Sequence, residues 1–298
     1  MTRHLGFQVD LSEKVISVTT KHRRKIIAFF DRFLMTLRKT GRLLVKDVQR
    51  MLGLQIWIST VFRVARQFLT SICDLLREVG ASIYFYPRRH RSLVARIIVD
   101  LKFWRRFVSC KPKSAFKFVL GHLPANGDKL ASDASSGWGM AGVLIFGKNN
   151  PHYPGFGGLF WQITWTEWEI IRSMDALAPG GVKINVAEFL AALITCETFS
   201  AHCSQKFTTL EIDNVSAKVW LDSARCPTFP FDRCAQGVHL HMLDTNMKIR
   251  TSWIPSADNK LADTLSRERF SMNRSGHCVN GVWVRRVKPR WQHVNRFL

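Results

Sequence analysis

The sequence predicts an α/β fold, a mixed sheet with flanking helices, in the second half of the chain, preceded by a basic and mostly helical region. Two observations support this division. Up to residue 108 the apolar residues recur at helical spacing, whereas from Leu130 onwards short segments between Gly, Ser and Asn turns predict strands. Three strands followed by alternating helices and strands are typical of an α/β domain with a mixed sheet.

In the first region the pattern predicts one short strand and four helices. The strand is Lys14–Thr19, and the fourth helix runs from about Arg89 to Val108. The apolar residues that define the four helices are Ile26, Phe30, Phe33 and Leu37; Val45, Val48, Leu52 and Ile56; Val61, Ala65, Phe68, Ile72, Leu75 and Val79; and Leu93, Val94, Ile97, Ile98, Leu101, Trp104 and Val108.

In the second region the elements alternate as an α/β domain requires. The predicted strands are Leu130–Asp133, Trp138–Phe146, Gly158–Trp165, Phe207–Asp213 and Lys248–Ile254. The predicted helices are Asn185–Ser200, Val215–Ala224, Asp232–Asp244 and Ser256–Arg267. We therefore expect three parts: a helical region over residues 1–112, an α/β domain over 126–270 and a basic tail over 271–298, with the main boundary between Cys110 and Asn126.

The net charge of +22 is concentrated at the two ends of the chain. Residues 1–112 hold 23 Lys and Arg against 7 Asp and Glu, residues 113–267 hold 14 against 14, and residues 268–298 hold 7 against 1. Such charge favours a nucleic-acid partner, because binding to phosphates releases counterions. A generic solubility charge and an anionic membrane surface are the alternative interpretations.

The fourth helix carries cations on the faces away from its apolar stripe. It is a candidate nucleic-acid-binding helix, and an ordinary surface helix with solvated Arg side chains is an equally good interpretation. Interfacial membrane binding is a third. The candidate nucleic-acid-binding residues are Arg91, Arg96, Lys102, Arg105 and Arg106.

Cysteine spacing and hydropathy point to an intracellular protein of the cytoplasm or nucleus. The seven cysteines form no CxxC pair, so neither a standard zinc site nor a disulfide framework is indicated. Residues 1–10 lack the apolar core of a signal peptide, and no run of about 18 apolar residues predicts a membrane span.

Four acidic residues lie at positions where catalytic and metal-binding side chains are common. Asp133 and Asp213 close predicted strands, Glu188 begins a helix, and Asp263 lies within one. Each has a structural interpretation: a turn cap for Asp133, a capping box with Asn185 for Glu188, a helix cap for Asp213 and an i,i+4 pair with Arg267 for Asp263. None of the four is therefore informative alone.

As a set, the four acids indicate a metal site. Two like charges roughly 4 Å apart repel by about 4 kcal/mol at an effective dielectric of 20, so clustered carboxylates stay ionised only beside cations. Carboxylates with water suit Mg²⁺ or Mn²⁺ rather than zinc. Two such ions, roughly 4 Å apart, would activate a water and stabilise the leaving 3′ oxygen of a phosphodiester.

The segments around these acids resemble a known family. LASDASSGWGMAGVL, INVAEFLAAL, LEIDN and SWIPSADNKLADTLSR resemble the ribonuclease H domain of retroelement reverse transcriptases, and are most similar to DIRS-like elements, which carry a tyrosine recombinase. The likeness covers roughly residues 128–270. It implies a ribonuclease H-like fold whose four catalytic, metal-binding acids are Asp133, Glu188, Asp213 and Asp263.

Residues 5–79 also resemble such enzymes, in the thumb and connection that follow the polymerase palm. LGFQVDLSEKVISV and LLVKDVQRMLGLQIW carry this likeness. The palm motif is missing, since no two Asp residues are adjacent, so we expect no polymerase activity from this chain. Where relatives often have a His before a Pro-Gly turn, this chain has Trp253-Ile254-Pro255-Ser256.

The resemblance implies a metal-dependent endonuclease that cuts the RNA strand of RNA–DNA hybrids. Its partners would be the hybrid and a polymerase part of the same element, with no membrane. Two alternatives stay open. One is a catalytically inactive nucleic-acid-binding fragment of a retroelement, and the other is a transposase or integrase of the same general fold.

Overall fold

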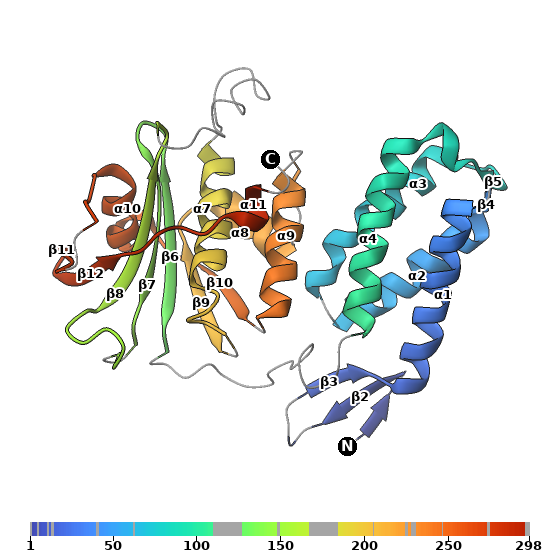
Figure 1. Ribbon diagram of the computed structural model, residues 1–298, viewed down its shortest axis with the longest axis horizontal. Coiled ribbons are helices and arrows are strands. Elements are labelled where there is room, and N and C mark those ends of the chain that lie inside the picture. Colours follow the sequence, from blue (N-terminus) through green and yellow to red (C-terminus); the bar gives the residue numbers. More distant parts are fainter. Residues whose placement is uncertain are drawn as a thin grey trace. The chain divides into compact units, whose positions relative to one another are not determined.

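The computed structural model divides the chain into two compact units, residues 1–121 and 122–298, each described by itself (Figure 1). It describes the chain apart from residues 1, 5, 11, 13, 14, 40, 41, 62, 110–126, 148, 149, 167–183, 205, 224, 225, 228–230, 246, 273, 274 and 296–298. The expected boundary between Cys110 and Asn126 lies outside the described residues. No described helix is long and apolar enough to cross a membrane.

The first unit is mostly helical, as its hydrophobic pattern predicts. An antiparallel sheet of three short strands precedes the helices, and a two-stranded ribbon pairs residues on either side of α2 and α3. The elements are β1 (Thr2–His4), β2 (Phe7–Asp10), β3 (Val15–Val18), α1 (Thr20–Lys39), β4 (Leu43–Leu44), α2 (Val45–Val61), η1 (Arg63–Leu69), α3 (Thr70–Val79), β5 (Tyr84–Phe85), η2 (Pro87–Arg89) and α4 (Arg91–Ser109).

The buried faces of this unit agree with the prediction at α1 and differ at α2. All four apolar residues predicted for α1 are buried. In α2 the predicted Ile56 is 46% exposed, and Met51, Gln55 and Ile58 are buried in its place. The predicted third helix is also wrong in its first half, where the chain forms the 3₁₀ helix η1 before α3 begins.

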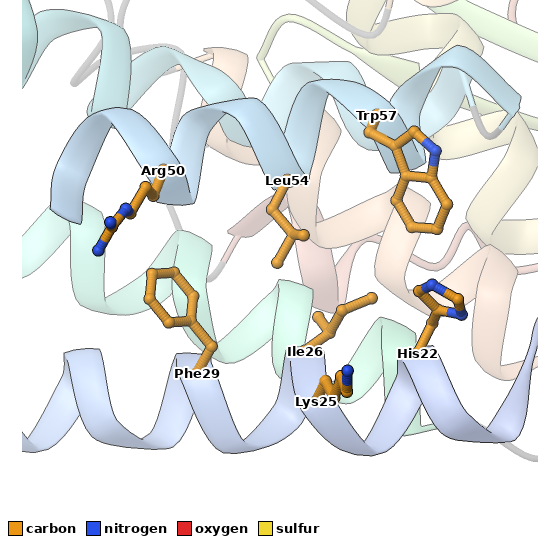
Figure 2. A pocket seen from close by; sticks show the side chains of 7 residues that line it. All are labelled: His22, Lys25, Ile26, Phe29, Arg50, Leu54 and Trp57. Carbon is orange, nitrogen blue, oxygen red and sulfur yellow. The ribbon is translucent and has the colours of Figure 1, made fainter. Parts of the chain in front are cut away.

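Between α1 and α2 lies a groove of about 550 Å³ with an apolar lining (Figure 2). Phe29 from α1 and Leu54 and Trp57 from α2 point into it, and cationic side chains stand at its rim. The ring of Phe7 stacks on the indole of Trp57, with a distance of 4.4 Å between the ring centroids. The lining residues are His22, Lys25, Ile26, Phe29, Arg50, Leu54 and Trp57.

The second unit contains a seven-stranded mixed sheet in the order β10-β9-β6-β7-β8-β12-β11. The first three strands in sequence form an antiparallel meander, and β9 and β10 then add in parallel beside β6. The strands are β6 (Lys129–Ser135), β7 (Gly139–Ile145), β8 (Gly158–Thr164), β9 (Phe207–Ile212), β10 (Lys248–Trp253), β11 (His277–Val279) and β12 (Val282–Arg286).

Helices cover both faces of this sheet, so the predicted α/β fold with a mixed sheet and flanking helices is confirmed. Figure 1 shows α7, α8 and α9 on one side and α10 on the other. The helix α7 is buried almost throughout, which explains its lack of a polar face. The helices are α7 (Ile184–Phe199), α8 (Val215–Ser223), α9 (Phe231–Asp244), η3 (Ser256–Asp258), α10 (Lys260–Arg267) and α11 (Gln292–Asn295).

The basic stretch 271–298, expected as a tail, contains folded elements. The hairpin β11–β12 adds to the sheet because β12 pairs in parallel with β8, and Val284 is fully buried. The short helix α11 follows and contacts α9 and α7. The fold of the second unit therefore continues past residue 270.

Candidate metal centre

Two neighbouring parallel strands bring the first pair of acids together. Asp133 lies on β6 two residues before its end, and Asp213 directly follows β9. The register pairs Ala131 with Glu211, so two residues further on Asp133 and Asp213 stand at the same level of the sheet. Because parallel strands end at one edge, this arrangement requires no special loop.

The third acid, Glu188, comes from the first turns of α7, the helix that packs on β6 and β7. The predicted capping box is wrong, because α7 begins at Ile184 and Asn185 lies inside the helix. The Oδ1 of Asn185 accepts a hydrogen bond of 2.9 Å from Asn214 Nδ2, which ties α7 to the turn after Asp213.

These three carboxylates form a group that fits a metal ion. Asp133, Glu188 and Asp213 each offer an oxygen within 4.8 Å of the other two. Glu188 Oε2 and Asp213 Oδ1 are buried and accept no hydrogen bond from any described residue. Buried acceptor atoms without a donor are costly, and a divalent cation with oxygen ligands would satisfy them.

Burial and mutual repulsion raise the pKa values of two of these acids. Burial, with added repulsion from Asp213 and Asp263, raises the pKa of Asp133 to about 7, although a hydrogen bond from Ser266 opposes the shift. Burial and the charges of Asp133 and Asp213 raise the pKa of Glu188 to about 9. A bound cation would favour the ionised carboxylates and reverse these shifts.

Asp263, the fourth expected acid, lies nearby but outside the group of three. It raises the pKa of Asp133 and of Glu188 through its charge, so it lies within electrostatic reach of both. Its Oδ1 accepts a hydrogen bond of 2.7 Å from Arg267 Nε, the i,i+4 pair that the sequence offers. Asp263 thus has a structural partner and a position beside the cluster.

Three buried polar side chains hold α10, and with it Asp263, against the sheet. Ser266 donates its hydroxyl to Asp133 Oδ2, and Asn259 Nδ2 donates to the Ser132 carbonyl at 3.1 Å. Gln162 on β8 donates to the carbonyls of Leu265 and Glu268 at 2.9 and 2.8 Å, and accepts from Phe270 N at 2.7 Å. The sequence pattern predicts none of the three, although Asn259 and Ser266 lie in the motif that carries the resemblance.

The candidate nucleic-acid-binding residues of α4 lie in the first unit, and two of them are ion-paired there. Arg96 lies 3.3 Å from Asp74, and Arg105 pairs with Asp31. Five of the cations on this helix were predicted from sequence: Arg91, Arg96, Lys102, Arg105 and Arg106. Ion pairing favours the ordinary surface-helix interpretation for Arg96 and Arg105, and leaves the other three open.

The histidines of α9 do not join the carboxylates. His239 is buried, its Nδ1 lies 2.8 Å from the Ala235 carbonyl, and burial lowers its pKa to about 4. His241 Nε2 lies 2.8 Å from the Ser200 hydroxyl. Both residues therefore have a structural role within the helical layer.

Comparisons with known proteins add a weak structural likeness. No family model matches the chain, and no curated protein matches it significantly. Among solved structures the chain is similar to ribonuclease H1 from the halophilic archaeon Halobacterium salinarum, with 17% identity and a TM-score of 0.32 over 46% of this chain and 92% of that chain. The fold class, an α/β domain with a mixed sheet and flanking helices, rests on the strand order and register given above.

Proposed function

We propose that the second unit is a metal-dependent nuclease that cuts the RNA strand of RNA–DNA hybrids. One observation carries the proposal: Asp133, Glu188 and Asp213 converge from three separate parts of the fold, and Glu188 and Asp213 each have a buried oxygen without a hydrogen-bond donor. Asp263 is the fourth acid in this proposal. Its ion pair with Arg267 is partly exposed to solvent, so Asp263 can exchange Arg267 for a cation. Carboxylate clusters of this kind are the ligands that Mg²⁺ or Mn²⁺ takes in phosphodiester hydrolysis.

The residues of the chain have separate roles in this proposal. Asp133 and Asp213 are fixed by strands, and Glu188 by a buried helix, so their oxygens are positioned before any ion or substrate binds. Ser266 orients the Asp133 carboxylate through its hydroxyl. Two divalent ions, when bound, would supply the charge that activates water and stabilises the leaving 3′ oxygen.

The choice of an RNA–DNA hybrid comes from the sequence motifs around the acids and from the charge of the chain. SDASSGWG, NVAEF, EIDN and ADTLSR resemble the ribonuclease H motifs of retroelement reverse transcriptases. An A-form-like hybrid displays 2′-hydroxyls across a wide minor groove, which distinguishes it from DNA. We infer that the chain is the C-terminal part of such an enzyme, with residues 1–112 as its thumb and connection.

The test is cleavage of strand-labelled duplexes by the full chain. We expect cutting of the RNA strand in a hybrid with Mg²⁺, none after chelation, and none of a DNA duplex. Binding of the hybrid without cutting would contradict the proposal and support an inactive nucleic-acid-binding fragment. Joining of labelled DNA ends to a target duplex would contradict it in favour of a transposase or integrase.

A further inference from the structure

Trp253 places an aromatic ring beside the backbone of Asp213, one of the three clustered acids. It is the last residue of β10 and pairs in register with Ile212, the residue before Asp213. Its indole Nε1 donates a hydrogen bond of 3.0 Å to the Asp213 carbonyl. This bond fixes the ring at the end of the strand that positions a metal ligand.

The ring is nevertheless half open to solvent, with 49% of Trp253 exposed. Two further apolar residues are exposed on the helix that follows Asp213: Val215 at 59% and Val219 at 52%, one turn apart on α8. Since α8 follows Asp213 and contacts β10, both elements next to Asp213 in the fold carry exposed apolar side chains. Apolar surface beside a functional site commonly marks a place where a ligand binds.

We propose that Trp253 packs against a sugar of the bound nucleic acid, close to the phosphodiester that would be cut at the carboxylate cluster, an inference that rests on the proposed function. The bases of a duplex are stacked on one another, whereas its sugars present C–H groups at the minor-groove surface. A flat indole face fits such a sugar. If cations at the cluster hold a phosphate of the nucleic acid, the sugar next to that phosphate would come within reach of the Trp253 ring, which is bonded to Asp213.

The geometry also defines what Trp253 contributes. The indole has one hydrogen-bond donor, and the Asp213 carbonyl already accepts it. The ring therefore offers only its face and edge, which makes its contact independent of base sequence. Its effect should fall on substrate binding and much less on the chemical step.

The experiment compares steady-state cleavage of a hybrid by the wild type, Trp253→Ala, Trp253→Phe and Trp283→Ala. Trp283 on β12 is a matched control, because it is 51% exposed and lies towards the other end of the sheet order. We expect Trp253→Ala to raise KM about tenfold, the size of one lost aromatic contact to nucleic acid, with kcat within about twofold. Trp283→Ala should leave both constants unchanged.

Trp253→Phe separates packing from the hydrogen bond. It keeps an aromatic face and loses the donor to Asp213, so a KM close to that of the wild type supports packing. If Trp253→Phe raises KM as much as Trp253→Ala, or if Trp253→Ala and Trp283→Ala have equal KM, the inference is overturned. A wild type that cuts no hybrid would instead overturn the proposed function. Hybrid affinity in an Asp133→Asn background, with and without Trp253→Ala, then tests the contact without turnover.

Discussion

Ser266 donates its hydroxyl to the carboxylate of Asp133 across 133 residues of sequence, and both side chains are buried. The same hydroxyl lies 2.9 Å from the carbonyl of Asp263, three residues earlier on α10. A hydroxyl has one hydrogen, so the two acceptors compete for it. The strand acid and the helix that carries the fourth acid are thereby coupled through one side chain.

Replacing Ser266 with alanine should weaken metal binding while the fold persists. Without the hydroxyl, Asp133 loses the group that orients it, and losses of this kind typically cost roughly 10- to 100-fold in metal affinity. We expect Mn²⁺ titration followed by electron paramagnetic resonance to show a shift of about tenfold. Ser223→Ala on α8 is the control, because among the described residues that hydroxyl bonds only to carbonyls of its own helix. Equal affinities in the two variants would exclude an orienting role.

Stability without metal should fall as pH rises. The raised pKa values of Asp133 and Glu188 mean that the folded state holds these protons more tightly than the unfolded state does. Between the ordinary carboxyl pKa and the raised values of about 7 and about 9, each rise in pH therefore favours unfolding. Mg²⁺ should restore stability, most strongly at the upper end of this window.

Thermal melting between about pH 5 and pH 9, in chelator and in Mg²⁺, measures this dependence. The double variant Asp133→Asn with Glu188→Gln removes both titrating groups, and comparison with it cancels the effect of all other charges. We expect a flatter pH profile and a smaller response to Mg²⁺ in the double variant. If melting temperature depends on pH in the same way in the wild type and in the double variant, the assignment of the titration to Asp133 and Glu188 is contradicted.

Gln162→Ala should destabilise the second unit by about 3 kcal/mol, because it leaves buried carbonyls and an amide without partners. Gln162 closes three hydrogen bonds at the end of α10, to Leu265, Glu268 and Phe270. Thr164→Ala, two residues along β8 at a partly buried position, is the control. Urea denaturation of both variants gives the comparison. A loss no larger than that of the control would show that α10 is held by its apolar face alone.

Gly142→Ala should be among the most disruptive single changes. A Cβ at Gly142 on β7 would collide with Thr195 Oγ1 and with the indole of Trp161, both fully buried. Overpacking of this kind costs about 3 kcal/mol. At Gly137 a Cβ meets nothing within 4 Å, so Gly137→Ala is a matched control that should leave the midpoint of urea unfolding almost unchanged. Similar midpoints in the two variants would mean that α7 can shift away from the sheet.

Cations of α4 should differ in their contribution to nucleic-acid binding. Within the described part of the chain no acid pairs with Arg91 or Lys102, whereas Arg105 is paired with Asp31. We expect the double change Arg91→Ala and Lys102→Ala to reduce the slope of log affinity against log salt by about 2, and Arg105→Ala to reduce it less. Fluorescence anisotropy over a salt series measures the slope. An unchanged slope in the double variant would assign α4 to a solvated surface.

Local patterns predicted most of the second unit because its strands and helices are each defined by neighbouring residues. The strands β6 to β10 and the helices α7 to α9 lie within about three residues of the predicted ranges. In α2 the pattern failed, since Gln55 and Ser59 are buried and a hydrophobic stripe cannot register polar residues. The prediction of an α-helix over the residues of η1 failed for a related reason. The buried residues of this 3₁₀ helix keep a spacing that also suits an α-helix.

The candidate site likewise contains residues that local sequence patterns predict and residues whose roles depend on long-range contacts. The sequence positions predict four acids as a set, Asp133, Glu188, Asp213 and Asp263. Parallel pairing of β6 with β9 brings Asp133 and Asp213 to one level, and α7 adds Glu188 to the group. Gln162 could not be predicted, because its partners lie more than 100 residues away and follow only from the docking of α10. Trp253 stands where proteins that carry similar motifs often have a His, and its bond to Asp213 depends on the register of β10 with β9.

The most direct test of the carboxylate cluster is hybrid cleavage by Asp133→Asn, with Asp222→Asn as the control. Asn preserves the shape of the side chain and removes its charge. Asp222 is a half-exposed acid on α8 that pairs with Lys218. With Mg²⁺ and a strand-labelled hybrid, the account predicts RNA cutting by the wild type and by Asp222→Asn, and none by Asp133→Asn. Undiminished cutting by Asp133→Asn would contradict it.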